Sequence, residues 1–333
     1  MSVTDRKARV LLHGSALLFL LLAFLLSLRF GSTLLDTPSF FGGLFRRAGH
    51  ESSTLILYRL RLPRALAGVL AGAGLATAGT LLQAATDNPL AAPQVLGINA
   101  GAGFFVILSL TCFPTAFALR PLAAFIGALL CGALILALSA RAGLGRTAVV
   151  LCGVALSALF SAGISFFSLL DADVLAAYTD FSIGGLGGTA MRELILPAAV
   201  ILAVLLCALS LCRDLRLFCL GDTLAASLGV RVRRVRLFAL ILACASAAAA
   251  VSFAGLLGFV GLIVPHAARR LARFHLTEEL LLSPVLGGTL LLLADLAGRV
   301  LLAPTEIPVG IFTALLGVPF FLYLLLKARW HRA

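Results

Sequence analysis

Long apolar runs alternate with short polar segments along almost the whole chain. A helix needs about 20 apolar residues to cross the core of a bilayer, and roughly eight to ten runs are long enough. The strands of a membrane barrel would alternate polar and apolar residues, which these runs do not do. We therefore predict an all-α polytopic membrane protein with ten transmembrane helices. The predicted helices span residues 10–28, 61–84, 93–111, 116–140, 147–170, 193–212, 237–256, 259–272, 280–303 and 309–327.

The polar segments between these helices are too short to form a separate domain. The longest are residues 30–57 and 213–236, so residues 1–333 are predicted to form a single transmembrane domain. The first apolar run follows Arg6, Lys7 and Arg9, as the apolar part of a signal peptide would. No small-residue cleavage pattern precedes Arg29, and we interpret this run as a retained first helix.

The distribution of charge predicts the orientation of the helices. The chain carries 26 lysines and arginines against 14 acids, for a net charge of +12. A soluble protein with this excess would be a candidate for binding nucleic acid, but here most basic residues fall in alternate loops. The positive-inside rule places those loops, together with the N- and C-termini, in the cytoplasm. The arginines near residues 61 and 299 then lie outside and need another explanation.

The second predicted helix is rich in small residues. Gly68, Gly72, Ala76 and Gly79 recur at helical spacing, which allows another backbone to approach closely in lipid. Packing within the bundle is the favoured interpretation, and a subunit interface is the alternative. A second small-residue stretch at 242–255 would enter the membrane from the opposite side. The pair suggests an inverted repeat of helices 2–5 and 7–10.

The sequence argues against catalysis and against a metal site in this chain. A nucleotide-binding P-loop needs a lysine after its glycines, and the only two lysines, Lys7 and Lys327, are not in such a loop. The five histidines form no HExxH motif and the seven cysteines no CxxC motif, so we predict no metal ligands and no catalytic residues. Asp171 and Asp173 could hold a metal diphosphate, but a helix cap is the simpler interpretation.

Two acids near the membrane interior have competing interpretations. Asp295 lies four residues before Arg299, a spacing that places both on one helix face and favours an ion pair. A proton relay is the alternative, since acids within a membrane are costly and often functional. Glu306 follows, and we interpret it as a cap at the start of the last helix.

Two polar segments interrupt the apolar pattern on the predicted cytoplasmic side. TDNPLAAPQVLG, residues 86–97, breaks a run that is too long for one crossing. In residues 213–236 the stretch LGDTLAASLGV is bounded by Gly221 and Gly229, which predicts a short helix with Asp222 as its N-cap. Such a helix could dock in a groove of another protein or lie on anionic lipid, and the pattern alone leaves these choices open.

The chain resembles the permease subunits of ABC importers for iron-siderophores, haem and vitamin B12. The resemblance rests on stretches that run in order through most of the chain after the first helix. They are RLPRALAGVLAGAGLATAGTLLQAATDNPLAAPQVLGINAGAG (61–103), IGGLGG (183–188), LGDTLAASLGV (220–230), GLLGFVGLIVPHAARRL (255–271) and LLLLADLAGRVLLAPTEIPVGIFTALLGVPFFLYLLLK (290–327).

This resemblance implies a transporter subunit of a bacterial inner membrane that is not itself an enzyme. Its implied partners are a second permease copy in a homodimer, two cytoplasmic ATPase subunits that bind ATP and Mg, and a periplasmic substrate-binding protein. The chain itself would need no cofactor and would bind no nucleic acid, and its cargo would be a metal chelate. The competing function is a secondary transporter coupled to protons through Asp295 or Glu306.

The resemblance also implies roles for individual residues. Thr147 matches less well than the others, because the sequence around it departs from the hydroxyl-rich pattern of the family. The implied contacts with the ATPase are Leu220, Gly221, Thr223, Leu228 and Gly229. The implied docking residues for the binding protein are Arg61, Arg64 and Arg299, and the implied cytoplasmic gate comprises Asn88, Leu90 and Thr147.

Overall fold

The computed structural model describes residues 3–141, 146–218, 221–273 and 275–330. Within these residues every regular element is helical, which confirms the all-α prediction. The elements are α1 (Val3–Arg29), α2 (Thr37–Leu44), α3 (Glu51–Leu55), the π-helical η1 (Ile56–Arg61), α4 (Leu62–Thr86), α5 (Ile98–Cys112), the 3-10 turn η2 (Phe117–Leu119), α6 (Arg120–Arg141), α7 (Arg146–Leu170), α8 (Ala172–Ile183), α9 (Met191–Ser210), α10 (Cys212–Phe218), α11 (Asp222–Ser227), α12 (Val232–Ala254), α13 (Val260–Leu271), α14 (Leu276–Val300) and α15 (Val309–Trp330).

Each of the ten predicted ranges coincides with one of these helices. Among the described residues, seven helical segments are long and apolar enough to cross a membrane, and residues 98–112 and 309–324 form shorter apolar helices. The protein is therefore a multi-pass membrane protein, while the number of ten crossings stays a prediction. The sequence analysis missed α8, which follows α7 after a single residue and is capped by Asp171. The Asp171 carboxylate accepts hydrogen bonds from the amides of Asp173 and Val174 at 2.8 and 3.3 Å, as the cap interpretation required.

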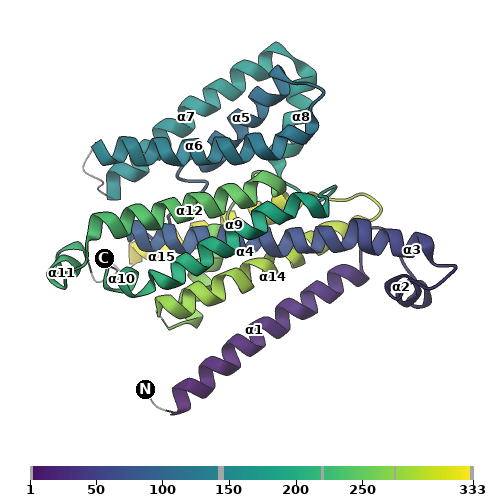
Figure 1. Ribbon diagram of the computed structural model, residues 1–333, viewed down its shortest axis with the longest axis horizontal. Helices are drawn as coiled ribbons and strands as arrows, with labels where there is room; N and C mark the ends of the chain where they lie inside the picture. Colours follow the sequence, from purple (N-terminus) through teal and green to yellow (C-terminus); the bar gives the residue numbers. More distant parts are fainter. Residues whose placement is uncertain (1–2, 142–145, 219–220, 274, 331–333) are drawn as a thin grey trace.

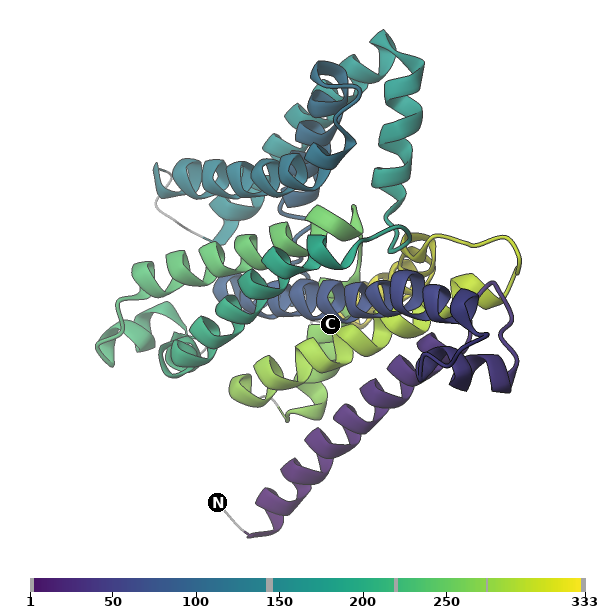
Figure 2. The same cartoon turned by 45° about the vertical axis from the view of Figure 1, so that its right-hand side comes forward.

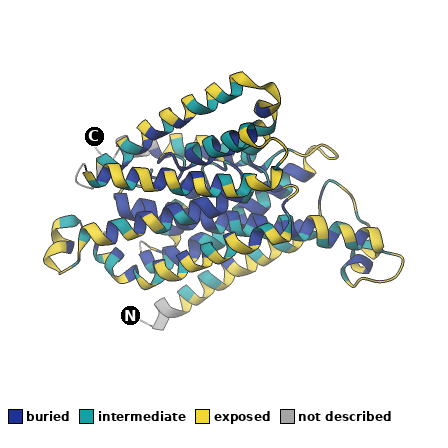
Figure 3. Ribbon diagram, turned by 45° about the horizontal axis from the view of Figure 1, so that its top comes forward, coloured by how far each residue is buried: buried dark blue, intermediate teal, exposed yellow. Residues whose placement is uncertain are grey.

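The helices form a layered bundle around α4 (Figures 1 and 2). Helices α5 to α8 lie on one side of it, and α14 followed by α1 lies on the other. The buried residues concentrate in the middle of the bundle, and the outer helices expose their outward faces (Figure 3). One large apolar core extends through α4, α5, α6 and α12. That residues 1–333 form a single domain stays a prediction. We call the two ends of the bundle the α3 end and the α11 end, after the helices found there (Figure 1).

Glycines set the closest helix crossings. A β-carbon added to Gly72 of α4 would overlap the carbonyl oxygen of Gly287 of α14, and one added to Gly287 would overlap that of Gly72. Gly79 meets the backbone of Gly261 in α13 in the same way. The small-residue face of α4 therefore packs inside this chain, as the favoured interpretation predicted, because two backbones in contact leave no room for side chains.

Two helices begin inside the bundle rather than at its surface. Helix α13 starts beside Gly79, about two turns before the end of α4. The turn before α5 packs at Gly97 against Gly153 of α7, which lies about two turns after the first residue of that helix. The segments that lead into α5 and α13 are tied together, since the amide of Phe259 donates to Oε1 of Gln94 at 3.0 Å.

The helix pairings on the two halves of the chain correspond. Helix α4 of the first half packs on α14, and its counterpart α12 packs on α6. Helix α5 packs on α6 and α7, and its counterpart α13 packs on α14 and α15. This pattern, together with the two helices that begin inside the bundle, supports an inverted repeat of α4–α7 and α12–α15, which stays a prediction.

Candidate functional site

A cluster of ionised side chains joins α4, α14 and the segment before α15 at the α3 end. Nε and Nη2 of Arg64 each lie 2.9 Å from Oδ1 of Asp295. Nη1 of Arg64 donates to Oε2 of Glu306 at 2.6 Å. Nε of Arg299 lies 2.9 Å from Oδ2 of Asp295, which confirms the predicted ion pair within α14. Both oxygens of the buried Asp295 therefore face arginine nitrogens.

The prediction that Glu306 caps the last helix was wrong. Helix α15 begins three residues later, at Val309, and the Glu306 carboxylate binds side chains of other segments. Glu306 binds Arg64 and accepts a hydrogen bond from Oγ of Ser32 at 2.6 Å. Partial burial by itself raises the pKa of Glu306. The hydrogen bonds from Ser32 and Arg64 and the positive charges of Arg64 and Arg299 outweigh that burial, so the pKa lies below its ordinary value. Glu306 is thus an ionised acid that ties the segment before α15 to α4.

Arg61 caps the C-terminal end of α1 by donating hydrogen bonds to its last carbonyl oxygens. Its Nη1 donates to the carbonyl oxygens of Leu28 and Arg29 at 2.9 and 2.8 Å, and its Nη2 donates to that of Thr33 at 2.5 Å. The last carbonyls of a helix have no partner within the helix. Arg61 supplies such partners from η1, and it is only 5% exposed.

Arg299 of α14 also binds the end of α1. Its Nη1 donates to the carbonyls of Ser27 and Phe30 at 3.2 and 3.0 Å, and its Nη2 donates to Oγ of Ser27 at 2.6 Å. Arg299 is 3% exposed. Two of the three predicted docking arginines therefore use their donors within the chain, and the side chain of Arg64 is 16% exposed. Their role in docking stays a prediction.

A cavity of about 300 Å³ opens between these arginines. Arg59, Arg61, Arg64, Arg299 and Glu306 contribute its charged lining. Gly188 and Thr189, from the IGGLGG motif and the residue after it, line it as well. Three sequence motifs from distant parts of the chain thus meet at one positively charged depression.

The predicted gate segment forms a tight turn after α4. Asp87 ends α4 with a positive φ of 47°, and Oδ1 of Asn88 accepts the amide of Leu90 at 2.9 Å. Asn88 and Leu90 are both half-buried. Thr147 lies exposed on the first turn of α7, whereas the segment contacts that helix further along, at Gly153. The structure thus brings the segment to α7, and the gate assignment stays a prediction.

The predicted short helix is present as α11. It is six residues long, and Gly221 and Gly229 flank it with φ values of 106° and 85°. A β-carbon at either glycine would meet no neighbour within 4 Å, so the backbone conformation, not space, is what favours glycine. Asp222 is the first helical residue and not the N-cap, which corrects that prediction. The predicted contact residue Leu220 lies outside the described residues.

The outer face of α11 is apolar and exposed. Leu224 and Leu228 are 57% and 58% exposed, and Thr223 is exposed beside them. The inner side is fixed by Arg236 of α12, whose Nη2 lies 2.8 and 2.9 Å from the two carboxylate oxygens of Asp222. The sequence analysis missed Leu224 and Arg236. Leu224 could have been found from its position four residues before Leu228, on the same face of the helix. The pairing of Arg236 with Asp222 could not, because it depends on how the chain turns between α11 and α12.

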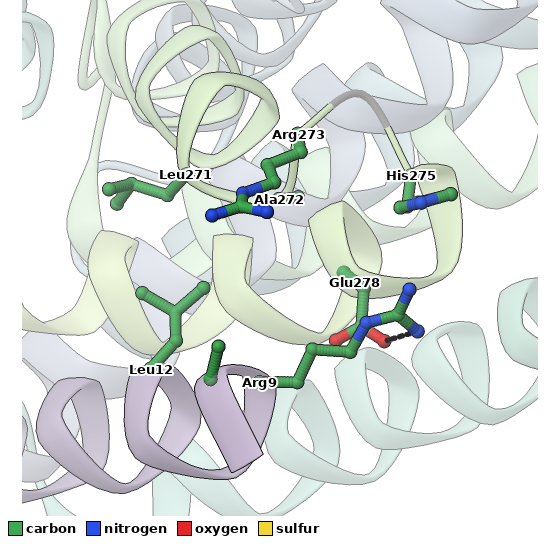
Figure 4. A pocket seen from close by; sticks show the side chains of 8 residues that line it. Arg9, Leu12, Leu271, Ala272, Arg273, His275 and Glu278 are labelled. Atoms are coloured by element: carbon green, nitrogen blue, oxygen red, sulfur yellow. Dashed lines mark hydrogen bonds and ion pairs between the residues drawn. The ribbon is translucent and has the colours of Figure 1, made fainter. Parts of the chain in front are cut away.

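A second cavity, of about 420 Å³, lies between the first turns of α1 and the loop that joins α13 to α14 (Figure 4). Arg9 of α1 binds Glu278 of α14 at 3.2 Å beside this cavity. Nε2 of His13 lies 2.5 Å from the other oxygen of Glu278. Helix α1 is therefore tied to α14 by charged side chains near both of its ends.

Comparison with known proteins decides the family. The model of the FecCD transport family matches residues 19–327, nearly the whole chain. The chain belongs to the FecCD transport family. Its relatives are transport permease subunits, so a role as a permease rather than an enzyme is supported for this FecCD protein as well.

Individual relatives align over almost their full length. The chain is 37% identical to the achromobactin transport system permease protein of Dickeya dadantii, over 94% of this chain and 90% of the relative. It is 38% identical to the hemin transport system permease protein of Yersinia pestis, over 94% and 96% of the two chains. A solved inward-facing structure of a metal-chelate type ABC transporter superposes on this FecCD chain with a TM-score of 0.84, at 28% identity, over 95% of this chain and 98% of that one.

Proposed function

We propose that this chain is the membrane-spanning subunit of an ATP-driven importer for a metal chelate in a bacterial inner membrane. The observation that carries the proposal is α11, a glycine-bounded helix that exposes Leu224 and Leu228 at one end of a membrane bundle. Exposed leucines on a short helix suit a groove in a partner protein better than water. In this family the partner is an ATPase, which would bind the ATP and Mg that this chain has no motif to bind.

The cargo class follows from the relatives' names. They include permeases for achromobactin, for hemin and for Fe(3+)-citrate, and a ferric siderophore, a ferric carboxylate or haem is therefore the class to test. Cobalamin, which the family resemblance also implied, belongs in the same test. Selection among them would depend on the periplasmic binding protein, because that protein captures the chelate first.

Two copies of the chain would enclose the pathway. Helices α7 and α15 expose large apolar side chains, among them Leu151, Leu159, Ile311 and Leu315 at 41–64% exposure. Such faces can be covered by lipid or by a second copy. A homodimer with one ATPase per permease is the simplest assembly that gives each α11 a partner, and chemical cross-linking in membranes would detect it.

The binding protein would dock at the α3 end. The depression around Arg64 and Arg59 is positive, so acidic side chains of the partner are the expected complement. Because Arg61 and Arg299 support α1, and Arg64 binds Asp295 and Glu306, substitution of the exposed Arg59 is the cleaner test of docking. We expect Arg59→Glu to weaken docking, and we expect docking of the natural chain to weaken as salt is raised.

The decisive experiment reconstitutes the permease with its co-encoded ATPase and binding protein in liposomes. Ferric citrate, a ferric hydroxamate and haemin labelled with radioactive iron, together with labelled cobalamin, serve as the probe panel. We expect uptake of at least one probe that requires ATP and binding protein and survives a proton uncoupler. Uptake that continues without the ATPase and stops with the uncoupler would instead establish the proton-coupled transporter. The contacts of both Asp295 oxygens with arginines disfavour that alternative.

A further inference from the structure

Arg236 connects three segments that are far apart in the sequence. The residue belongs to the second turn of α12 and is 5% exposed. Its Nη2 binds both carboxylate oxygens of Asp222, the first residue of α11. Its Nε donates to the carbonyl oxygen of Ala85, at the end of α4, at 3.2 Å. Its guanidinium carbon lies 5.0 Å from the centre of the Phe218 ring of α10.

This set of contacts needs an arginine. Guanidinium presents several N–H donors in one rigid plane, so it can hold a carboxylate on one edge and a carbonyl on another while it stacks on a ring. The carbonyl of Ala85 is among the last of α4, which have no partner within the helix. A lysine could keep one of these contacts but lacks the fixed fork that makes them together.

The position of Ala85 gives the contact its significance. Asp87, two residues later, takes the left-handed conformation that starts the predicted gate segment with Asn88 and Leu90. Helix α11 packs on α10 and α12, and through Arg236 it also has a polar connection to the end of α4. The helix expected to meet the ATPase and the turn expected to close the pathway are therefore separated by one side chain.

We propose that Arg236 is a positioning residue that couples displacement of α11 to the end of α4 and so to the segment 87–97. The Arg236 side chain is 6% exposed and the Asp222 side chain 45% exposed, so separation of the pair would take the carboxylate away from a buried positive charge, which is unfavourable. The pair with Asp222 is therefore retained when α11 moves, and the carbonyl of Ala85 moves with it. The inference rests on the proposed function, since it assumes that an ATPase displaces α11.

The test uses the reconstituted complex of permease, ATPase and binding protein. The variants are Arg236→Met, which keeps the length of the side chain, Asp222→Asn, and the double variant. We expect each single variant to lower the ATP hydrolysis stimulated by the binding protein, and probe uptake per ATP, by about tenfold, the size of one lost charged hydrogen bond. Because the two groups act in series, the double variant should be no worse than either single one.

Three controls separate coupling from folding and docking. Arg234→Met removes an exposed arginine from the same helix and should leave coupling unchanged. Arg236→Lys should restore part of it, since an ammonium can still reach Asp222. The ATPase should co-purify with every variant, because the exposed face of Leu224 and Leu228 is intact.

The outcomes that would overturn the inference are distinct from failure of the proposed function. Full coupling in Arg236→Met, losses in the double variant that multiply, or loss of the ATPase from the purified complex would each contradict a coupling role. If the unmodified complex shows no ATP-driven uptake of any probe, the proposed function itself fails.

Discussion

The two ends of the helix bundle both contain buried, paired arginines, but they differ in the side chains that they leave exposed. At the α3 end, Arg61 and Arg299 are buried and bind the last carbonyls of α1, and Arg64 joins two acids. At the α11 end, Arg236 is buried and binds Asp222. Arg233 and Arg234 of the same helix are exposed, and so are Leu224 and Leu228 of α11. Motif arginines can therefore serve the fold first, and at the α11 end the exposed leucines, rather than an absence of ion pairs, mark the surface left open for a partner.

Removal of the central acid at the α3 end should have the largest effect on stability. Asp295→Leu leaves Arg64 and Arg299 buried without their shared carboxylate, a change that costs about 3–5 kcal/mol. We expect a much lower midpoint of thermal unfolding for the purified protein in detergent. Asp36→Leu is the matched control, because Asp36 is exposed at the same end and its side chain makes no cap hydrogen bond. Equal midpoints for the two variants would contradict the role assigned to the cluster.

Loss of the α1 cap should have the next largest effect. Arg61→Met removes the donors for three backbone carbonyls and should destabilise the protein by about 2 kcal/mol. Arg59→Met, two residues earlier and exposed, should change stability little. Thermal unfolding of both variants checks the difference. If Arg59→Met proves as damaging as Arg61→Met, burial does not distinguish the two arginines as we argue.

The effect of Glu306 should be smaller and should depend on pH. Its pKa lies below the ordinary 4.5 in the folded protein, so its stabilising contribution is complete above about pH 4.5 and disappears as the pH falls through the lowered value. For a partly exposed pair the contribution is below about 1 kcal/mol. We expect the unfolding midpoint of Glu306→Gln to fall less on acidification than that of the unmodified protein. If the unfolding midpoints of the two proteins change in parallel with pH, the ionised Glu306 does not contribute to stability as we argue.

Substitutions on the exposed face of α11 should have the smallest effect on stability. Leu224→Ser and Leu228→Ser replace side chains that pack little within the chain, so the unfolding midpoint should not change. Association with the ATPase should weaken by about tenfold or more for each, the value of burying one leucine. Co-purification and titration with the ATPase measure this, and Ala226→Ser on the same helix is the control. Undiminished association would place the ATPase contact elsewhere.

The sequence predicted the helices better than their contacts. Apolar length predicted the ten helical ranges, and the small residues of α4 predicted the close approach that is found at Gly72 and Gly79. Gly221 and Gly229 predicted the short helix between them. The pair within α14 was also local, since Asp295 and Arg299 are four residues apart.

Contacts between distant segments left no such signal. The bond from Arg64 to Glu306 joins residues 242 positions apart, and nothing near Glu306 distinguishes it from a helix cap. The burial of Arg61 depends on where α1 ends in space, which periodicity does not define. Helix α8 was missed because its apolar stretch is short and follows α7 almost without a break.

The crossing of α4 and α14 has a mechanical consequence. At Gly72 and Gly287 the two backbones touch with no layer of side chains between them. Side chains that change rotamer are what allow packed helices to slide past one another, and none is available at this point. We therefore expect α4 and α14 to behave as one stiff lever during transport. The bending would then occur where the backbone is not helical, in residues 87–97 and 255–259.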